Sequence, residues 1–379
     1  MTINMAGIYI HIPFCKKKCH YCDFYKTLDT GMAERFISAL GKEMLIQKDY
    51  LEDKTFNTIY LGGGTPSVLT AIQIREILEK VNSVFAVTED AEITMEANPD
   101  DISKVYARDL KKAGINRISL GIQSWNDEIL KFLNRRHTAD MAEEAMRDIS
   151  DSGIENISAD LIYGIPGMTT KQWKEDLLKT LSLNIKHLSA YHLTIEKDTV
   201  FGKMKQAGKL HEIKEEESER QFNILTDICL KHDFIQYEIS NFCKEGYFSI
   251  HNTNYWRQEP YLGLGPSAHS YNGDSRQWNV SDLPAYLKSL DKDEVPGTVE
   301  NLTLKDRYNE YIMTSLRTMW GVNIDLVEEK INKETRDYLN NLATRFVKYG
   351  MMTKKGNQLV LTDQGKMISD NIISELMMT

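Results

Sequence analysis

Three of the five cysteines of this chain fall within one stretch of eight residues, from Cys15 to Cys22. Cys15, Cys19 and Cys22 lie too close together for a disulfide framework, and their spacing suits one metal centre instead. Zinc usually takes four protein ligands, and no further Cys or His pair stands nearby at zinc-finger spacing. Three thiolates on a short loop suit an iron–sulfur cube that keeps one iron open. Small thiols packed in a core are the alternative, but buried cysteines have no reason to cluster between charges.

Charged and apolar neighbours suggest how this loop is held. Lys16, Lys17 and Lys18 stand between the first two cysteines, and we expect their positive charge to help keep the thiols ionised. The preceding stretch 8–12 is short, apolar and rich in isoleucine, which predicts a buried strand running into the loop.

The strand at 8–12 begins a pattern of six strand-then-helix units. Strands are expected at 8–12, 58–61, 92–96, 117–120, 157–162 and 187–191. Helices are expected at 32–50, 71–85, 103–112, 127–133, 140–151 and 170–181. Such alternation predicts an α/β fold with a parallel sheet covered by helices.

A parallel sheet of this kind carries its chemistry at the carboxyl ends of its strands. The cysteines follow the first strand, and the run 62–66, Gly-Gly-Gly-Thr-Pro, follows the second. The later strands end at or near Glu96, Gln123, Asp160 and His192. Because polar or glycine-rich residues recur at corresponding positions, we expect one site there.

The order C-x-x-x-C-x-x-C after a short apolar strand, with Tyr21 just before the last cysteine, resembles the radical S-adenosylmethionine (radical SAM) superfamily. The resemblance implies a partial (βα)6 TIM-like barrel that binds a [4Fe-4S] cluster. It also implies that the amino and carboxylate groups of SAM chelate the open iron. One electron then breaks a carbon–sulfur bond of SAM, chemistry that side chains cannot perform.

The resemblance also assigns SAM-binding residues. Gly63, Gly64 and Thr65 match the loop that meets the methionyl part of SAM, and Tyr9 matches a position near the adenine. The remaining positions that match SAM-binding residues are Tyr21, Glu96, Gln123, Arg135 and Asp160.

Each of these assignments has a simpler alternative. The glycines could form a plain turn. The acidic and amide side chains, Glu96, Gln123 and Asp160, could cap the following helices, and Arg135 could be a solvated surface charge. Function is favoured because a buried strand end is a costly place for an unpartnered carboxylate.

A second motif comprises His251, Asn252, Tyr255 and Trp256. A histidine near two aromatic residues could be an ordinary core residue, or it could offer an axial ligand and flat faces to a porphyrin. The order H-N-x-x-Y-W resembles the heme chaperone branch of the radical SAM proteins, relatives of the oxygen-independent coproporphyrinogen III dehydrogenase. The resemblance makes these four residues heme-binding candidates, and the next candidate ligands are His20, His192 and His269.

Three functions from different classes follow. The dehydrogenase branch carries a further cysteine where this chain has Phe24, and a long extension before the first strand, so the resemblance favours a heme chaperone. Such a protein binds the cluster, SAM and heme, needs a reductant, and passes heme to an acceptor hemoprotein, in this family one of the respiratory chain. The alternatives are a radical enzyme of porphyrin biosynthesis and a metal-stabilised interaction scaffold. Reductive SAM cleavage is expected in the first two, and the sequence assigns no catalytic side chain.

Composition narrows the class of partner. The net charge of −9 argues against a nucleic-acid partner, and no apolar run is long enough to cross a bilayer. The start of the chain has no basic region typical of a signal peptide. Clustered reduced cysteines then predict a cytoplasmic protein.

The predicted domains are a barrel core at 1–200, a barrel extension carrying the second motif at 201–300, and a winged-helix-like α+β module at 301–379. Within the extension, 214–230 reads as an amphipathic helix and 234–239 as a strand. The stretch 291–302 is acidic and contains Pro and Gly, so it is expected to be an unstructured linker. The module has no basic excess for DNA, and we expect a lid or partner surface for the barrel.

Overall fold

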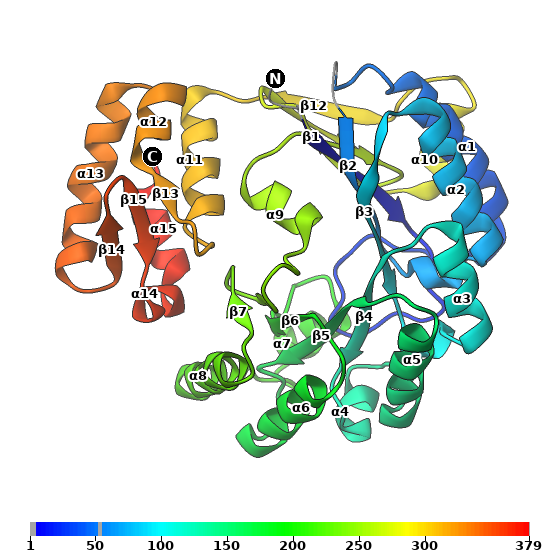
Figure 1. The fold of residues 1–379 in the computed structure, drawn as a ribbon, viewed down its shortest axis with the longest axis horizontal. Helices are drawn as coiled ribbons and strands as arrows, with labels where there is room; N and C mark the ends of the chain where they lie inside the picture. Colours follow the sequence, from blue (N-terminus) through cyan, green and yellow to red (C-terminus); the bar gives the residue numbers. More distant parts are fainter. Residues whose placement is uncertain (1–4, 52–54, 379) are drawn as a thin grey trace.

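One twelve-stranded sheet organises the barrel, in the order β12-β11-β10-β9-β1-β2-β3-β4-β5-β6-β8-β7. The structure is a computed structural model and describes residues 5–51 and 55–378. Helices cover the outer side of the curved sheet, and a smaller module stands beside it (Figure 1). Because the sheet has two free ends, β12 and β7, the barrel is open, as the radical SAM resemblance implies.

The six central strands are parallel and pair in sequence order. They are β1 (Met5–Ile12), β2 (Thr55–Gly63), β3 (Val87–Ala97), β4 (Arg117–Gln123), β5 (Asn156–Tyr163) and β6 (His187–His192). The helices between them are α1 (Ala33–Ile46), α2 (Ala71–Val84), α3 (Lys104–Ala113), α4 (Asp127–Phe132), α5 (Ala139–Asp151) and α6 (Thr170–Ser182). The predicted partial (βα)6 barrel is therefore confirmed.

Local chemistry explains these boundaries. Thr70 and Thr169 begin α2 and α6 with complete capping boxes, each closed by a glutamine three residues later. Asn126 caps α4 with its side-chain oxygen, and Gly114 ends α3 in the left-handed region at φ +109°. All residues of β4 are buried, as expected for a central strand of a parallel sheet.

Residues beyond the sixth unit extend the sheet at both ends. They form α7 (Val200–Gln206), α8 (Glu215–Lys231), β7 (Ile235–Gln236), β8 (Asn241–Cys243), α9 (Ile250–Trp256), β9 (Tyr261–Leu264), β10 (His269–Tyr271), β11 (Ser275–Asn279), α10 (Leu283–Leu290) and β12 (Gly297–Asn301). Strand β9 pairs with β1, and β8 pairs with β6.

Two sequence predictions for this region need correction. The strand expected at 234–239 is only β7, two residues long, followed by β8. The stretch 291–302 is not wholly a linker, because β12 pairs with β11 along five residues. All five residues of β12 are exposed, so the strand is held by backbone hydrogen bonds and has no apolar alternation that could reveal it.

The C-terminal module has its own hydrophobic core. Its elements are α11 (Leu304–Ser315), β13 (Val322–Asn323), α12 (Ile324–Lys330), α13 (Lys333–Lys348), β14 (Met352–Lys355), β15 (Gln358–Leu361), α14 (Asp363–Met367) and α15 (Ser369–Leu376). The three strands form a small antiparallel sheet, as in a winged helix. The end of the module is divided into two helices, α14 and α15, because Ile368 leaves helical geometry at φ −118°, ψ 28°.

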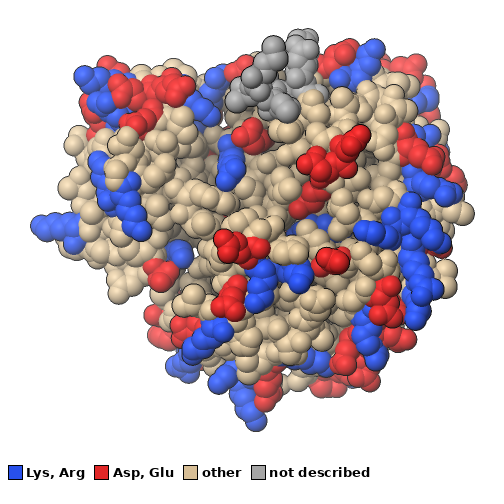
Figure 2. Space-filling view, viewed as in Figure 1, with Lys and Arg blue, Asp and Glu red and all other residues tan. Residues whose placement is uncertain are grey.

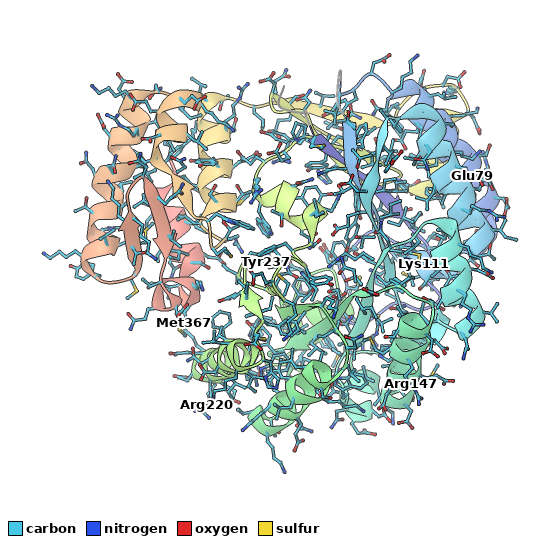
Figure 3. All side chains as sticks on the ribbon, viewed as in Figure 1. Glu79, Lys111, Arg147, Arg220, Tyr237 and Met367 are labelled. Atoms are coloured by element: carbon cyan, nitrogen blue, oxygen red, sulfur yellow. The ribbon has the colours of Figure 1, made fainter. Side chains whose placement is uncertain are left out.

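Polar and aromatic contacts join this module to the barrel. Arg276 on β11 donates two hydrogen bonds, of 2.6 and 2.7 Å, to the Glu310 carboxylate on α11. Tyr237, labelled in Figure 3, lies near the module, and its carbonyl accepts a 2.9 Å bond from the Met319 N–H. The Tyr237 hydroxyl reaches inward to His187 Nε2 at 2.7 Å. The module is therefore anchored in part to Tyr237, whose side chain also reaches the buried His187 in the barrel.

The surface carries both signs of charge. Figure 2 shows Lys and Arg interspersed with Asp and Glu over the visible face. Among the residues that the structure describes, no helix combines the length and the apolar character needed to cross a membrane.

A buried carboxylate ties helix α1 to the added strands. Glu43 is 0% exposed and accepts hydrogen bonds from the Gly265 N–H at 2.8 Å, Asn279 Nδ2 at 2.5 Å and the Tyr286 hydroxyl at 2.6 Å. Burial raises the pKa of Glu43, and these three donors oppose the rise. The contact fixes β9 and β11 against the first βα unit.

Glu43→Ala should destabilise the protein by about 3 kcal/mol, because it leaves three buried donors unsatisfied. Urea unfolding followed by circular dichroism measures the loss. Ser38→Ala, at an exposed position of the same helix, is the control and should change the free energy of unfolding by less than about 0.5 kcal/mol. Equal stability of both variants would contradict the role of Glu43.

Candidate functional site

A cavity of about 450 Å³ lies inside the barrel. The candidate residues that line it are Cys15, Cys19, Tyr21, Cys22, Gly63, Gly64, Thr65, Glu96, Gln123, Arg135, Asp160 and Asn252. Tyr9, His251, Tyr255 and Trp256 are not among its lining residues. The structure thus brings the cysteines and the predicted strand-end residues to one place, and it puts most of the second motif behind the wall.

Each of the three clustered sulfurs has a polar hydrogen-bonding partner. The Cys15 thiol and the Thr65 hydroxyl share a hydrogen bond of 3.2 Å. Lys26 Nζ donates to Cys22 Sγ at 3.1 Å, and Arg135 Nη1 donates to Cys19 Sγ at 3.5 Å. Burial raises the pKa of Cys15, and its hydrogen bond with Thr65 opposes the rise.

The expected role of the lysines needs correction for Lys16. Its Nζ pairs with the buried carboxylate of Asp101 at 2.6 Å. The cations that contact the sulfurs, Lys26 and Arg135, come from outside the three-lysine run.

The donor set fits an iron–sulfur cluster. Within residues 5–51 and 55–378, no three His, Cys, Asp or Glu side chains converge as a site for one metal ion. A cluster asks for a different arrangement, because each thiolate binds its own iron and the sulfurs can stand apart around the cavity. The three cysteines line one cavity, and each sulfur has a polar partner, so they are suited to bind a cluster.

The glycine loop after β2 is closely packed against the cysteine loop. The Gly64 N–H donates to the Ile12 carbonyl and the Thr65 N–H to the Phe14 carbonyl, each at 2.8 Å. A Cβ at Gly64 would lie 2.7 Å from the Ile12 oxygen, and Gly63 has φ +100°. The glycines therefore do more than permit a turn, since they let two loops of the site touch.

Arg135 is a buttress of the site and not a solvated charge. Its Nη2 donates to Asn98 Oδ1 at 2.6 Å and to the Gly121 carbonyl at 2.7 Å, while Nη1 reaches Cys19. The capping alternative also fails, because the helices after β3, β4 and β5 are capped by Ser103, Asn126 and Thr169.

The two carboxyl groups lie inside the barrel and have shifted pKa values. Burial raises the pKa of Glu96 to about 7, against hydrogen bonds from the Tyr60 hydroxyl at 2.9 Å and the Gly63 N–H at 3.1 Å. Burial also raises the pKa of Asp160, whose oxygens accept bonds of 2.9 and 2.8 Å from Ser119. A carboxyl with a pKa near neutrality is typical of functional sites.

The second motif lies on α9, which the sequence did not identify as a helix. His251 is 1% exposed, and its Nδ1 and Nε2 share hydrogen bonds with Thr58 Oγ1 at 2.8 Å and the Tyr255 hydroxyl at 2.9 Å. Its ring stacks on Tyr60 with centroids 5.1 Å apart. Burial, with the Arg117 charge, lowers the pKa of His251 to about 3, so the imidazole is neutral, the form that binds metals.

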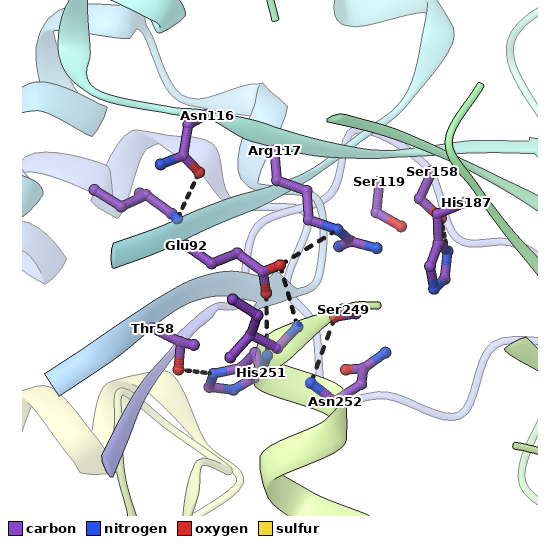
Figure 4. Close-up of polar contacts among 12 residues, drawn as sticks. Thr58, Glu92, Asn116, Arg117, Ser119, Ser158, His187, Ser249, His251 and Asn252 are labelled. Atoms are coloured by element: carbon purple, nitrogen blue, oxygen red, sulfur yellow. Dashed lines mark hydrogen bonds and ion pairs between the residues drawn. The ribbon is translucent and has the colours of Figure 1, made fainter. Parts of the chain in front are cut away.

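A carboxylate from β3 holds the start of this helix (Figure 4). The helix lies at the end of the barrel away from the cysteine loop, which we call the floor of the barrel. Glu92 accepts hydrogen bonds from the Ile250 N–H at 3.1 Å and the His251 N–H at 3.0 Å. Negative charge at a helix N-terminus is favourable, and the Ser249 side chain caps the Asn252 N–H. Asn252 is thereby placed at the cavity wall while His251 stays behind it.

Sequence reasoning missed several lining residues. These are inward-facing side chains of the same strands and their loops, among them Tyr60, Asn98, Arg117, Ser119 and Tyr191. Arg117 and Ser119 are two residues apart on β4, so their side chains point to the same face of the sheet. A charged residue at the start of an otherwise largely apolar strand could have indicated that Arg117 faces the site.

Glu96→Gln should change how stability depends on pH in protein without SAM. A pKa of about 7 in the folded state means that the folded protein holds the proton more tightly than the unfolded chain does. Stability from this group is present below the unfolded pKa and is lost as pH rises through about 7. Urea unfolding should therefore show a steeper fall from about pH 5 to pH 7 in wild type than in the variant. Exposed Glu89→Gln on the same strand is the control, and parallel wild-type and Glu96→Gln curves would contradict the shift.

Comparison with known proteins agrees with this geometry. A profile of the radical SAM superfamily matches residues 9–179, and a profile of the HemN C-terminal domain matches residues 302–368. The heme chaperone HemW of Bacillus subtilis is 33% identical, over 97% of this chain and 98% of the relative. HemW of Lactococcus lactis is 32% identical, over 98% and 97%.

A solved structure has the same overall fold. Coproporphyrinogen III oxidase (HemN) from Escherichia coli, described as a radical SAM enzyme, matches with a TM-score of 0.85 over 99% of this chain and 90% of that one. Its sequence identity of 22% supports the fold alone. With its cysteine loop, its barrel and full-length relatives above 30% identity, the chain belongs to the radical SAM superfamily and, within it, to the family of the heme chaperone HemW.

Proposed function

We propose that this protein is a heme chaperone that binds a [4Fe-4S] cluster, SAM and heme, and transfers heme to an acceptor hemoprotein. The observation that carries the proposal is one cavity lined both by the three cysteines and by Asn252 of the H-N-x-x-Y-W motif. Near full-length similarity to HemW proteins supports the same function.

Cys15, Cys19 and Cys22 are proposed to hold the cluster. When bound, the cluster supplies one electron for reductive cleavage of the SAM sulfonium. Lys26 and Arg135 offset the negative charge that three thiolates bring into the cavity. The unpaired state of all five cysteines in the described chain suits a reducing compartment, and we place the protein in the cytoplasm.

SAM is proposed to occupy the cavity between the cysteines and the strand ends. The glycine loop offers close approach to the backbone, and Glu96 and Asp160 offer acceptors to ammonium and hydroxyl groups. The other proposed contacts are Tyr21, Gly63, Gly64, Thr65, Gln123 and Arg135, whereas Tyr9 is proposed to act indirectly. Tyr9 lies behind the residues that line the cavity. Its hydroxyl is hydrogen-bonded to His11 at 3.1 Å and its ring stacks on Tyr60, so we propose that it supports the position of Tyr60 in the cavity wall.

Heme is proposed to bind at the H-N-x-x-Y-W helix. Asn252 faces the cavity, whereas His251 can ligate iron only after giving up its bond to Thr58 or Tyr255. His192 is the competing ligand, because it lines the cavity and is exposed. Acceptor hemoproteins of the respiratory chain and a reductant for the cluster complete the proposed partners.

A coproporphyrinogen dehydrogenase remains the rival function. Phe24, where that branch has its further cysteine, is 69% exposed and lines the cavity beside the cluster loop. Protein reconstituted without oxygen should form no protoporphyrinogen when it is mixed with coproporphyrinogen III, SAM and reductant. A second sample of the same preparation should bind heme. Release of carbon dioxide with protoporphyrinogen would overturn the chaperone proposal.

Cys19→Ala should abolish the cluster while the fold remains. Cys19 is half-buried on a loop, so its removal costs little packing, but the cluster loses one of three ligands. Iron and sulfide per chain after anaerobic reconstitution, together with circular dichroism, measure both effects. Cys229→Ala, which removes a core thiol on α8, is the matched control and should keep its iron. Full iron content in Cys19→Ala would refute the ligand assignment.

His251→Ala should weaken heme binding by about tenfold or more and spare SAM binding, as expected when a ligand to iron is lost. Heme titration followed by absorbance gives the affinity, and His211→Ala at an exposed position is the control. Thr58→Val frees Nδ1 without removing the ring and should retain heme. Should His251→Ala bind heme as wild type does while His192→Ala fails, the axial ligand is His192.

A further inference from the structure

Arg117 is a buried arginine whose guanidinium makes no hydrogen bond within the described residues. It opens β4, is 1% exposed, and lines the cavity that the cysteines also line. In the part of the chain that the structure describes, no side-chain N–H of Arg117 donates a hydrogen bond, and its Nε is both buried and unsatisfied. Guanidinium groups carry five donors, so a buried one without partners is costly and unusual.

The nearest counter-charge does not satisfy it. Glu92 Oε2 lies 3.9 Å from Arg117 Nε, beyond hydrogen-bond distance (Figure 4). The oxygens of Glu92 already accept from the Ile250 and His251 N–H groups at the start of α9. Glu92 therefore balances the charge of Arg117 at a distance while its hydrogen bonds serve the helix.

The other acceptors that interact with the charge of Arg117 are also engaged. Asp160 accepts from Ser119 and Ser158. His187 uses Nδ1 on Ser158 and Nε2 on the Tyr237 hydroxyl, at 2.7 Å each. The guanidinium therefore has no hydrogen-bond acceptor among the described residues, and Arg117 is one of the residues that line the cavity.

We propose that Arg117 receives a carboxylate of the molecule that enters the barrel, which, resting on the function proposed above, is a propionate of the porphyrin. A carboxylate matches the planar fork and can accept two parallel hydrogen bonds. Arg117 stands four residues before Gly121 on β4, roughly 13 Å away along the strand at 3.3 Å per residue, on the side away from the cysteine loop. A ligand anchored there extends from the floor toward the cysteine end.

The test compares heme with heme dimethyl ester, which lacks the negative charges. Wild type should bind heme about tenfold to hundredfold more tightly than the ester, as expected for a charge-assisted bidentate contact. Arg117→Gln should lose most of that preference and keep the iron content of its cluster. Arg117→Lys keeps the charge without the fork and should show an intermediate preference.

Controls separate binding from folding. Arg117→Gln leaves Glu92 without a counter-charge, so the double variant Glu92→Gln/Arg117→Gln, which removes both charges, is measured alongside by circular dichroism and titration. If both fail to fold, Arg117→Lys, which keeps the positive charge, decides, because a full preference in that variant would show that the guanidinium fork does not bind the carboxylate. Equal wild-type affinity for heme and ester overturns the inference, as does an undiminished preference in a folded Arg117→Gln protein. Failure of wild type to bind either molecule overturns the proposed function instead.

Discussion

The contact between the cysteine loop and the glycine loop is the constraint on which the site depends. Two backbone hydrogen bonds, from Gly64 and Thr65 to Ile12 and Phe14, bring the loops after β1 and β2 together. Thr65 then meets the Cys15 sulfur, and the Gly63 N–H meets Glu96 on the next strand. A side chain at Gly64 would clash with the backbone of the cysteine loop, so the close approach of the two loops requires glycine at this position.

Inside the barrel, polar side chains are arranged in layers that follow the pleat of the strands. Alternate residues of each strand face inward, so Glu92 and Glu96 on β3, and Arg117 and Ser119 on β4, occupy successive depths. The floor layer holds α9 through Glu92, and the upper layer meets the cysteine loop through Arg135. Charges in this interior are therefore shared between holding the fold and facing the cavity.

The sequence predicted the six βα units and the cysteine loop because both have strong local signals. Apolar runs such as 157–162 mark buried strands, and three close cysteines have few other meanings. β12 escaped detection because its residues pair only through the backbone, and α9 because seven residues are too few for a helical period.

Contacts between distant parts of the chain were also beyond prediction. Arg135 reaches Cys19 from 116 residues away, whereas Lys16, adjacent in sequence to Cys15, binds Asp101. Likewise Glu92 caps a helix 158 residues later, a pairing that no periodicity encodes. Local sequence patterns therefore identified the cysteine loop and the strand ends. The contact between Glu92 and α9 could be found only from the tertiary structure.

The free ends of the sheet at β12 and β7 have a mechanical consequence. In a closed barrel, the number of strands and their stagger fix the circumference, and a wider interior requires broken ladders. In this open arc, a change of twist between neighbouring strands can widen or narrow the interior while every inter-strand hydrogen bond is kept. The bore of the barrel is thus adjustable by bending alone.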